Sequence, residues 1–226
     1  MMPRSILLFG PIAFCAASAA FAKSDSQLWL TSAANVKLAD KWRLSEEVTT
    51  RFSDKKGGLY ELEMHTLVGY RLSKTVTAWA GYTHDPQYAD GKVATVEHRA
   101  REQVTFDNVA SLGRGKLSAR IRFEERWRSN ADGTGWRVRP FVRYTLPFKR
   151  SGGAGITFTS EPFFNLDTTS FQAKRGLDRM RNLIAVTTPI GKHLTGEFGY
   201  MNQHIFVDRK PDESDNIAWI SIGASL

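Results

Sequence analysis

Apolar and polar residues alternate along almost the whole chain after residue 26, and the segment 117–129 (LSARIRFEERWRS) shows the pattern most fully. One side of this segment carries Leu117, Ala119, Ile121, Phe123 and Trp127, and the other carries Arg120, Arg122, Glu124, Arg126 and Arg128. A helix would scatter the apolar positions around its circumference, whereas a strand places all of them on one face. The segment therefore predicts a β-strand with one apolar and one charged face.

Similar alternation recurs along the rest of the chain, and turn signals rich in glycine separate the segments. We expect strands at about residues 27–38, 42–52, 59–72, 76–84, 93–106, 117–128, 136–146, 156–164, 180–189, 194–206 and 216–226. Longer polar links are expected at 85–92, 167–177 and 207–215. No linker or break in composition divides the chain, so we predict one β domain.

Two β architectures fit this alternation. A soluble barrel or sandwich turns the apolar face inward, whereas an outer-membrane barrel turns it outward into lipid. Strand length favours the second, because residues 117–128 and 136–146 reach the roughly 9–11 residues that a tilted membrane strand needs. Aromatic residues near strand ends also favour it, since they resemble girdles at two water interfaces: Tyr60, Tyr70, Tyr82, Trp127, Trp136 and Tyr144.

The predicted fold class is therefore all-β, an antiparallel transmembrane β-barrel. Closure is required because every backbone N–H and C=O must be paired in lipid. The alternation gives eleven strands, but bacterial single-chain barrels have even strand numbers. We accordingly expect a barrel of 10–12 strands, with twelve favoured.

The first residues read as a cleaved signal peptide. Arg4 precedes a mostly apolar run, and Ala20-Phe21-Ala22 forms a small-x-small cleavage site. The predicted division is a signal peptide at residues 1–22 and a single outer-membrane β-barrel domain at residues 23–226. The one cysteine, Cys15, lies in the leader, so the predicted mature chain excludes a disulfide framework and thiolate metal sites.

The chain is basic, with 31 lysines and arginines against 23 acidic residues and a formal net charge of +8. A positive balance favours nucleic acid, anionic lipid or acidic solutes as partners. Predicted export to the bacterial outer membrane makes nucleic acid the least suitable of these. The expected partners are outer-membrane lipid and small anionic solutes, and no cofactor or metal is expected.

Several motifs also resemble those of a known family. They are Trp29, EHRAREQ at 97–103, ARIRFEERW at 119–127, VRPFVRY at 138–144 and SEPFFN at 160–165. In their order and spacing the chain resembles the bacterial family catalogued as domain of unknown function 2490. The resemblance implies an outer-membrane β-barrel and implies no particular activity or catalytic residue.

If the apolar face meets lipid, the charged face lines the barrel interior. The basic residues predicted there, called the basic ladder below, are Arg99, Arg101, Arg120, Arg122, Arg126, Arg137, Arg139 and Arg143. Their expected acidic partners are Glu61, Glu63, Glu97, Glu124 and Glu161. Three consecutive strands, at 93–106, 117–128 and 136–146, carry the whole ladder, so the positive excess should form one wall.

Two interpretations of this wall remain open. In the first, Arg–Glu pairs fill a narrow interior and stabilise it, because unpaired buried charge is costly. In the second, the arginines line a narrow channel for small anionic solutes, because guanidinium groups stay charged and bind carboxylate or phosphate.

Catalysis is not expected, and no catalytic or metal-binding residue is assigned. His84 beside Asp85 and His98 beside Glu97 are the nearest approach to the pairs that a lipid-modifying barrel enzyme would need. No two histidines share a face at a metal-ligand spacing. A lipid-modifying outer-membrane enzyme and a soluble periplasmic barrel that binds an acidic ligand are the alternative functions.

Overall fold

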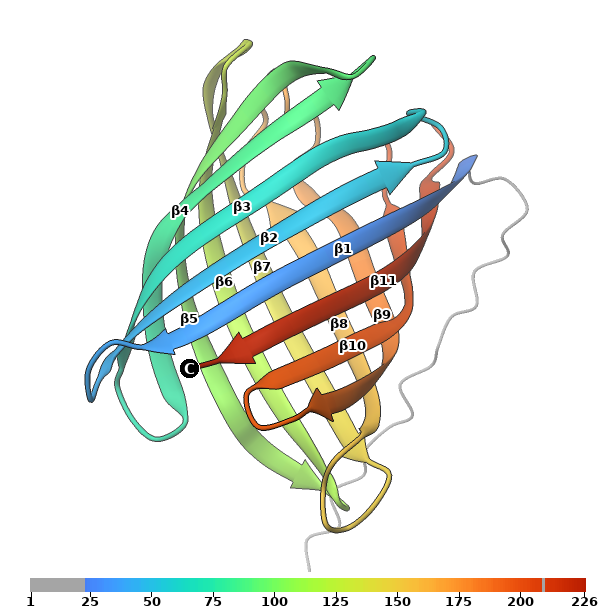
Figure 1. Cartoon of the computed structure of the whole chain (residues 1–226). Helices are drawn as coiled ribbons and strands as arrows, with labels where there is room; N and C mark the ends of the chain where they lie inside the picture. The colour runs from blue at the N-terminus through green and yellow to red at the C-terminus, as the bar shows by residue number, and fades with distance from the viewer. Residues whose placement is uncertain (1–22, 209) are drawn as a thin grey trace, which may run out of the picture.

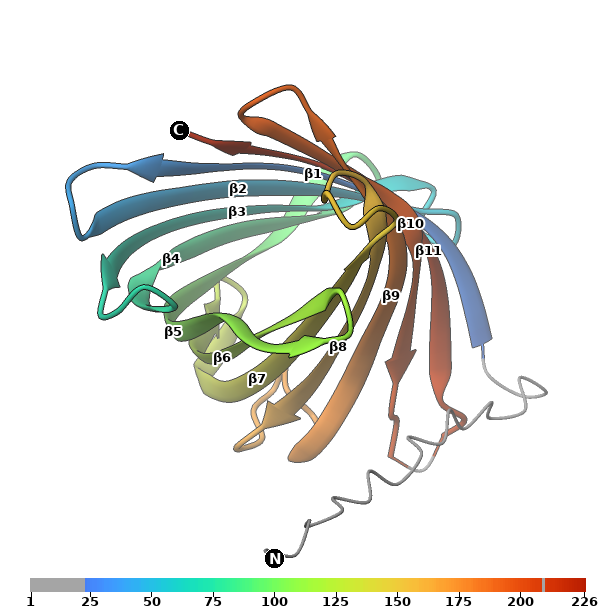
Figure 2. The same cartoon turned by 90° about the horizontal axis from the view of Figure 1, so that it is seen from below.

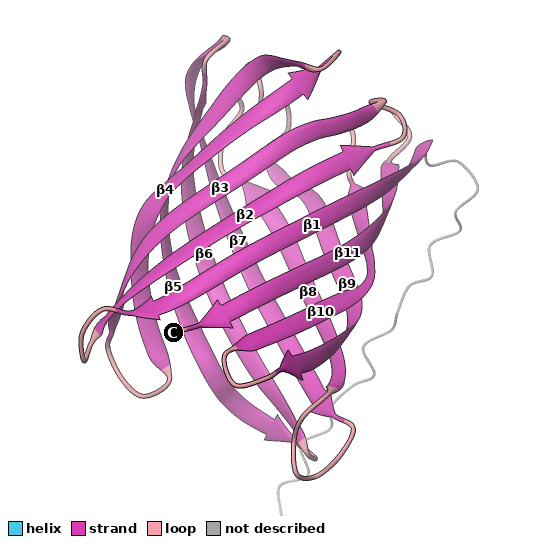
Figure 3. Cartoon of the chain, viewed as in Figure 1, coloured by secondary structure: helices cyan, strands magenta, loops and turns pink. Residues whose placement is uncertain are grey.

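A computed structural model describes residues 23–208 and 210–226, and these residues form one closed barrel of eleven strands (Figures 1 and 3). The strands are β1 (Lys23–Lys37), β2 (Trp42–Ser53), β3 (Gly58–Arg71), β4 (Val76–Ala89), β5 (Lys92–Leu112), β6 (Gly115–Arg128), β7 (Ala131–Pro147), β8 (Gly155–Asn165), β9 (Gly176–Ile190), β10 (Leu194–Ile205) and β11 (Glu213–Ser225). The predicted all-β barrel is confirmed. Within the described ranges, no helix is long and apolar enough to cross a membrane.

A barrel with an odd number of strands closes through one parallel pair. Each strand pairs with its sequence neighbour in antiparallel fashion, so β1 and β11 run in the same direction and meet as a parallel pair from Lys23↔Glu213 to Asn35↔Ser225. The favoured number of twelve strands was wrong, because the parallel pair removes the need for an even count. The predicted signal peptide, residues 1–22, lies outside the described residues.

The alternation places apolar side chains outside and charged side chains inside. On β6, Ile121 is 55% exposed on the outer face, whereas its neighbour Arg122 is 6% exposed and points inward. Figure 2, seen from below, shows the strands wrapping around a common interior. The outer face also carries the exposed apolar side chains of Val68, Val142 and Ile220.

The polar link expected at 85–92 is instead a continuous hairpin. Strand β4 extends to Ala89 and β5 begins at Lys92. Asp90 and Gly91 form a two-residue turn with φ of 50° and 72°. Both central residues of a type I′ turn need positive φ, and an Asp-Gly pair meets this demand at low cost. The long links near 167–177 and 207–215 are present as the β8–β9 and β10–β11 connections.

Two of the six aromatic residues expected in interface girdles lie elsewhere. The register between β2 and β3 shifts at Arg51/Phe52, and Tyr60 turns inward, where its hydroxyl donates to Gln27 Oε1 at 2.8 Å. Tyr82 lies in the middle of β4, not at its end. Trp127 and Trp136 do lie on the outer face toward one end of the barrel, and Tyr70 and Tyr144 toward the other.

Candidate functional site

Three arginines surround Glu97 on β5 in the upper part of the interior, where upper means toward the β4–β5 turn as in Figure 1. Its carboxylate is fully buried, and it accepts hydrogen bonds from Arg99 Nε at 2.6 Å, Arg126 Nε at 2.8 Å and Arg128 Nε at 2.7 Å. The register places these side chains together, because Glu97 faces Arg128 and Arg99 faces Arg126 across the β5–β6 pair. Charge-assisted bonds of this kind compensate for burial of the carboxylate.

Glu124 on β6 forms a second cluster of buried ion pairs, between β6 and β7. We call these two clusters the Glu97 centre and the Glu124 centre. Glu124 accepts two bonds from Arg137, at 2.8 and 2.6 Å, and one from Arg139 Nη1 at 2.8 Å. Arg139 also donates to Glu161 Oε2 at 2.9 Å, and Arg120 donates to the other oxygen of Glu161. Strands β6, β7 and β8 are thereby connected through their inward side chains.

Glu63 on β3 extends the Glu97 centre toward the neighbouring strands β4, β3 and β2. Arg99 hydrogen-bonds both Glu63 and Asp85, and Arg51 on β2 hydrogen-bonds both Glu61 and Glu63. All five side chains are largely buried. Asp85 was missed in the sequence, although it continues the inward alternation of Thr77, Trp79, Gly81 and Thr83.

Arg101 and Arg122 are the ladder members without a close carboxylate. Arg101 contacts His65 Nδ1 and donates to Thr83 Oγ1 at 3.1 Å. Arg122 donates to Gln103 Oε1 at 3.0 Å, and its ion-pair partner Glu124 lies 3.7 Å away. The other six ladder arginines hydrogen-bond a carboxylate.

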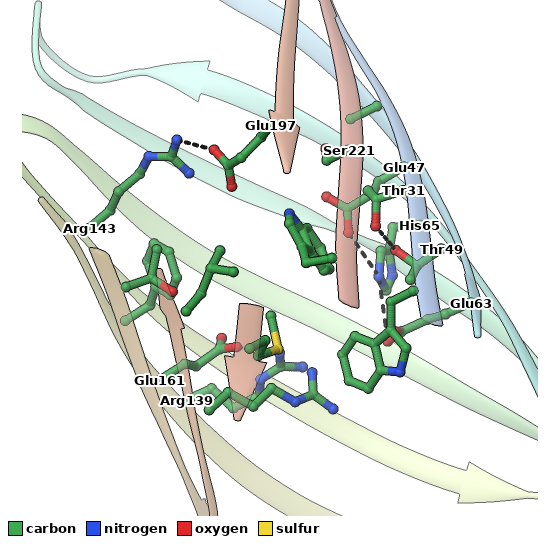
Figure 4. Close-up of a pocket in the computed structure, with 18 of the residues that line it drawn as sticks. Thr31, Glu47, Thr49, Glu63, His65, Arg139, Arg143, Glu161, Glu197 and Ser221 are labelled. Atoms are coloured by element: carbon green, nitrogen blue, oxygen red, sulfur yellow. Dashed lines mark hydrogen bonds and ion pairs between the residues drawn. The ribbon is translucent and has the colours of Figure 1, made fainter. Parts of the chain in front are cut away.

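Two large cavities lie in the interior that the described residues enclose, and a smaller one of about 70 Å³ lies beside Arg51, Phe163 and Arg181. The lower cavity has a volume of about 260 Å³ and is shown in Figure 4, where Arg143 faces Glu197 on one side and His65 lies between Glu47 and Glu63 on another. The upper cavity has a volume of about 380 Å³. The lower cavity is lined by six arginines and four glutamates: Arg51, Arg120, Arg122, Arg139, Arg143, Arg181, Glu47, Glu63, Glu161 and Glu197.

Trp29, Arg51 and Arg181 line both cavities, and we call these three residues the partition. The Trp29 ring is 1% exposed and lies under both guanidinium groups, with centroid distances of 4.1 Å to Arg51 and 4.6 Å to Arg181. Arg181 Nε donates to Gln203 Oε1 at 2.7 Å, and no ion pair of Arg181 is found among the described residues. The partition therefore lies between the two large charged cavities, and its two arginines also line the smaller one.

One arc of the interior is apolar, which the predicted charged face did not anticipate. The apolar arc consists of Trp29, Leu183, Ala185, Met201 and Ile217, with Trp219 packed against it. These residues come from β1, β9, β10 and β11, which are neighbours in the closed barrel. Their strands carry apolar residues on both faces, as in Leu183-Ile184 and Ile217-Ala218, so alternation could not reveal which side chains point inward.

The β8–β9 connection reaches back into the upper end of the interior. Gln172 is 3% exposed and accepts a hydrogen bond from Arg126 Nη1 at 2.7 Å. The Phe171 ring lies 5.7 Å from the Arg126 guanidinium and 5.1 Å from that of Arg128. This contact could not be predicted, because a polar loop has no periodicity that would indicate its direction.

The histidines considered for catalysis do not contact the acids next to them in sequence. His84 and His98 lie side by side on the outer face, with ring centroids 5.5 Å apart, while Asp85 and Glu97 are buried inside. Tyr82 O–H contacts His98 Nδ1. Consecutive strand residues point to opposite faces, which explains the separation. Among residues 23–208 and 210–226, no group of three or more His, Cys, Asp or Glu side chains could hold a metal ion.

The remaining well-placed histidine organises the β10–β11 connection. His204 Nε2 lies 2.9 Å from Asp212 Oδ2, and the backbone N–H of Val207 donates to Asp212 Oδ1 at 3.0 Å. The Val207 hydrogen bond, followed by that of His204, holds the pKa of Asp212 below its usual value. This arrangement shapes the loop and lies away from the two arginine centres.

Comparisons with known proteins place the chain among proteins without an assigned role. The family described as protein of unknown function (DUF2490) matches residues 26–214. An uncharacterised protein of Methylorubrum extorquens strain AM1 is 26% identical over 199 residues, which cover 88% of this chain and 86% of that protein. No solved structure matches the chain.

Proposed function

The chain belongs to the family of unknown function DUF2490, and from this premise we propose that it is an outer-membrane barrel that admits small anionic solutes to its interior. In this proposal the Arg–Glu centres stabilise the barrel wall, and the partition keeps the passage closed at rest. Both interpretations of the charged wall thus apply, to different parts of the same interior. The single observation that carries the proposal is the pair of cation-rich cavities on either side of Trp29, Arg51 and Arg181.

The charge of the accessible interior supports selection of anions. The upper cavity, like the lower one, has more cationic than anionic side chains: Arg51, Lys55, Lys56, Arg128, Arg179 and Arg181 against Asp25, Glu61, Glu213 and Asp215. Fixed positive charge in a confined, poorly hydrated space attracts anions and repels cations. Arg101 and Arg181 have no ion pair among the described residues, and Arg122 has only a long one, 3.7 Å from Glu124, so the charge of these three is the least neutralised.

The proposed location follows from the outer face. An apolar belt with aromatic residues toward both ends suits a bilayer with two water interfaces. Glu125 fits this placement, because it lies on the outer face of β6 only three residues before Arg128, where the strand ends. A carboxylate so close to the boundary costs less than one at the bilayer centre.

Cell fractionation tests the location. We expect the protein in the outer-membrane fraction, soluble only in detergent, with faster gel mobility before heating than after it because the closed barrel resists dodecyl sulfate. A protein recovered from the periplasm without detergent contradicts the proposal and favours the soluble barrel that binds an acidic ligand. Hydrolysis of lipid esters that is lost in His98→Ala would instead favour the enzymatic alternative.

Planar bilayers test the selectivity. Purified barrel is expected to conduct in brief openings, with a reversal potential in a KCl gradient close to that of chloride, because the interior carries excess arginine. Arg122→Glu should move the reversal potential toward that of potassium, whereas Arg114→Glu, in the β5–β6 turn, should leave it nearly unchanged. Wide steady conductance, cation selectivity or complete silence in the wild-type protein would contradict anion passage.

A further inference from the structure

We infer that the lower cavity binds a small aromatic carboxylate, with its acid group at Arg122 and its ring against the apolar arc. This inference rests on the proposed function, because it names the class of anion that the interior accepts. It starts from the two unlike walls of one cavity. Arginines of β6 and β7 form one wall, and the apolar arc with Trp219 contributes Trp29, Leu183 and Met201 to the other.

Arg122 offers the charge for the acid group. It lines the cavity and is 6% exposed, yet its nearest carboxylate oxygen lies 3.7 Å away. Only its Nε donates a hydrogen bond, to Gln103 Oε1, and its two Nη groups have no hydrogen-bond partner among the described residues. Buried donors are nearly always satisfied in proteins. A ligand carboxylate would supply the acceptors that this wall lacks.

The apolar wall indicates what the rest of the ligand is like. Leu183 is 6% exposed and Met201 7% exposed, and both line the same cavity as the arginines. A passage for simple inorganic ions gains nothing from such side chains, whereas a ligand with an apolar body gains from burying it. Trp29 and Trp219, with ring centroids 6.4 Å apart, favour an aromatic body because aromatic rings attract one another in tilted arrangements.

The volume limits the size of the ligand. About 260 Å³ equals the space of about nine liquid water molecules, each taking about 30 Å³. A compact molecule of about ten non-hydrogen atoms fills such a space. Phenylacetate has this size, one negative charge and one ring, so it is the probe of choice.

Calorimetric titration of the folded barrel in detergent tests the inference with three probes. Phenylacetate should bind at least about tenfold more tightly than 2-phenylethanol, which lacks the charge, and than acetate, which lacks the ring. Arg122→Gln should weaken phenylacetate binding about tenfold or more and leave 2-phenylethanol unaffected, while Arg122→Lys should retain part of the affinity. Arg114→Gln is the control, because Arg114 lies in the β5–β6 turn and lines neither large cavity.

The three probes on the wild-type protein decide the matter even if a variant fails to fold. Equal binding of phenylacetate and 2-phenylethanol overturns the inference. A loss of binding in Arg114→Gln equal to that in Arg122→Gln overturns it too. Anion-selective current from a barrel that does not bind phenylacetate overturns the inference and leaves the proposed function standing. Phenylacetate binding that depends on Arg122, in a barrel that passes cations, supports the inference and overturns the proposed function.

Discussion

Replacing Glu97 by glutamine is expected to lower the free energy of unfolding by about 3–5 kcal/mol, the usual effect of breaking a buried ion pair by removing one partner. Glu97 is 0% exposed and accepts hydrogen bonds from Arg99, Arg126 and Arg128. Glutamine keeps the shape but removes the negative charge, so three guanidinium groups remain close together without their common counter-ion. Unfolding in urea, followed by tryptophan fluorescence and by gel mobility without heating, measures the change.

The control for this variant lies on the same strand. Asp107→Asn removes an equal charge from an exposed position of β5 beside the β3–β4 turn, where Asp107 N–H donates to Thr75 O, and should change stability by no more than about 0.5 kcal/mol. Adding Arg126→Gln to Glu97→Gln should restore part of the lost stability, because it removes one of the uncompensated cations. Equal losses from Glu97→Gln and Asp107→Asn would contradict the central role of the Glu97 centre.

The alternation of apolar and polar residues along the sequence predicted most of the fold. It located all eleven strands. Together with strand length, it correctly predicted that Ile121 and the other apolar residues on its face point away from the interior. It failed where local geometry outweighs periodicity. The Asp90-Gly91 turn made a hairpin from residues expected to be a link, and the register shift at Arg51/Phe52 turned Tyr60 inward.

The charged part of the interior was predictable in its residue types and not in its pairing, and the apolar arc was not predicted. Each ladder arginine lies on a strand whose alternation can be read directly, and the structure places all eight inside. Which carboxylate each one reaches depends on register across strands far apart in sequence, as for Arg99 and Glu63. Closure likewise brings β1 beside β11, so the contact of Trp29 with Trp219 has no local signal.

In the passage that we propose, Trp29 is expected to be the main barrier, because it lines both large cavities. Trp29→Ala is expected to open a steady, anion-selective conductance, because it removes the plate that separates the lower and upper cavities. Arg51 and Arg181 would also lose the ring that holds their guanidinium groups in place. The truncation should cost about 3–5 kcal/mol of stability, in line with loss of a buried tryptophan.

Single-channel recording in planar bilayers measures this opening, after gel mobility without heating has shown that the variant is folded. Trp136→Ala is the matched control, since it removes an indole from the outer face of β7 and should leave the passage closed. Arg181→Ala provides a second route, because Arg181 lines both cavities and has no ion pair among the described residues to disturb. If both Trp29→Ala and Arg181→Ala fold and remain as closed as the wild-type barrel, the partition is not the barrier, and the Arg–Glu centres around Glu97 and Glu124 must close the interior instead.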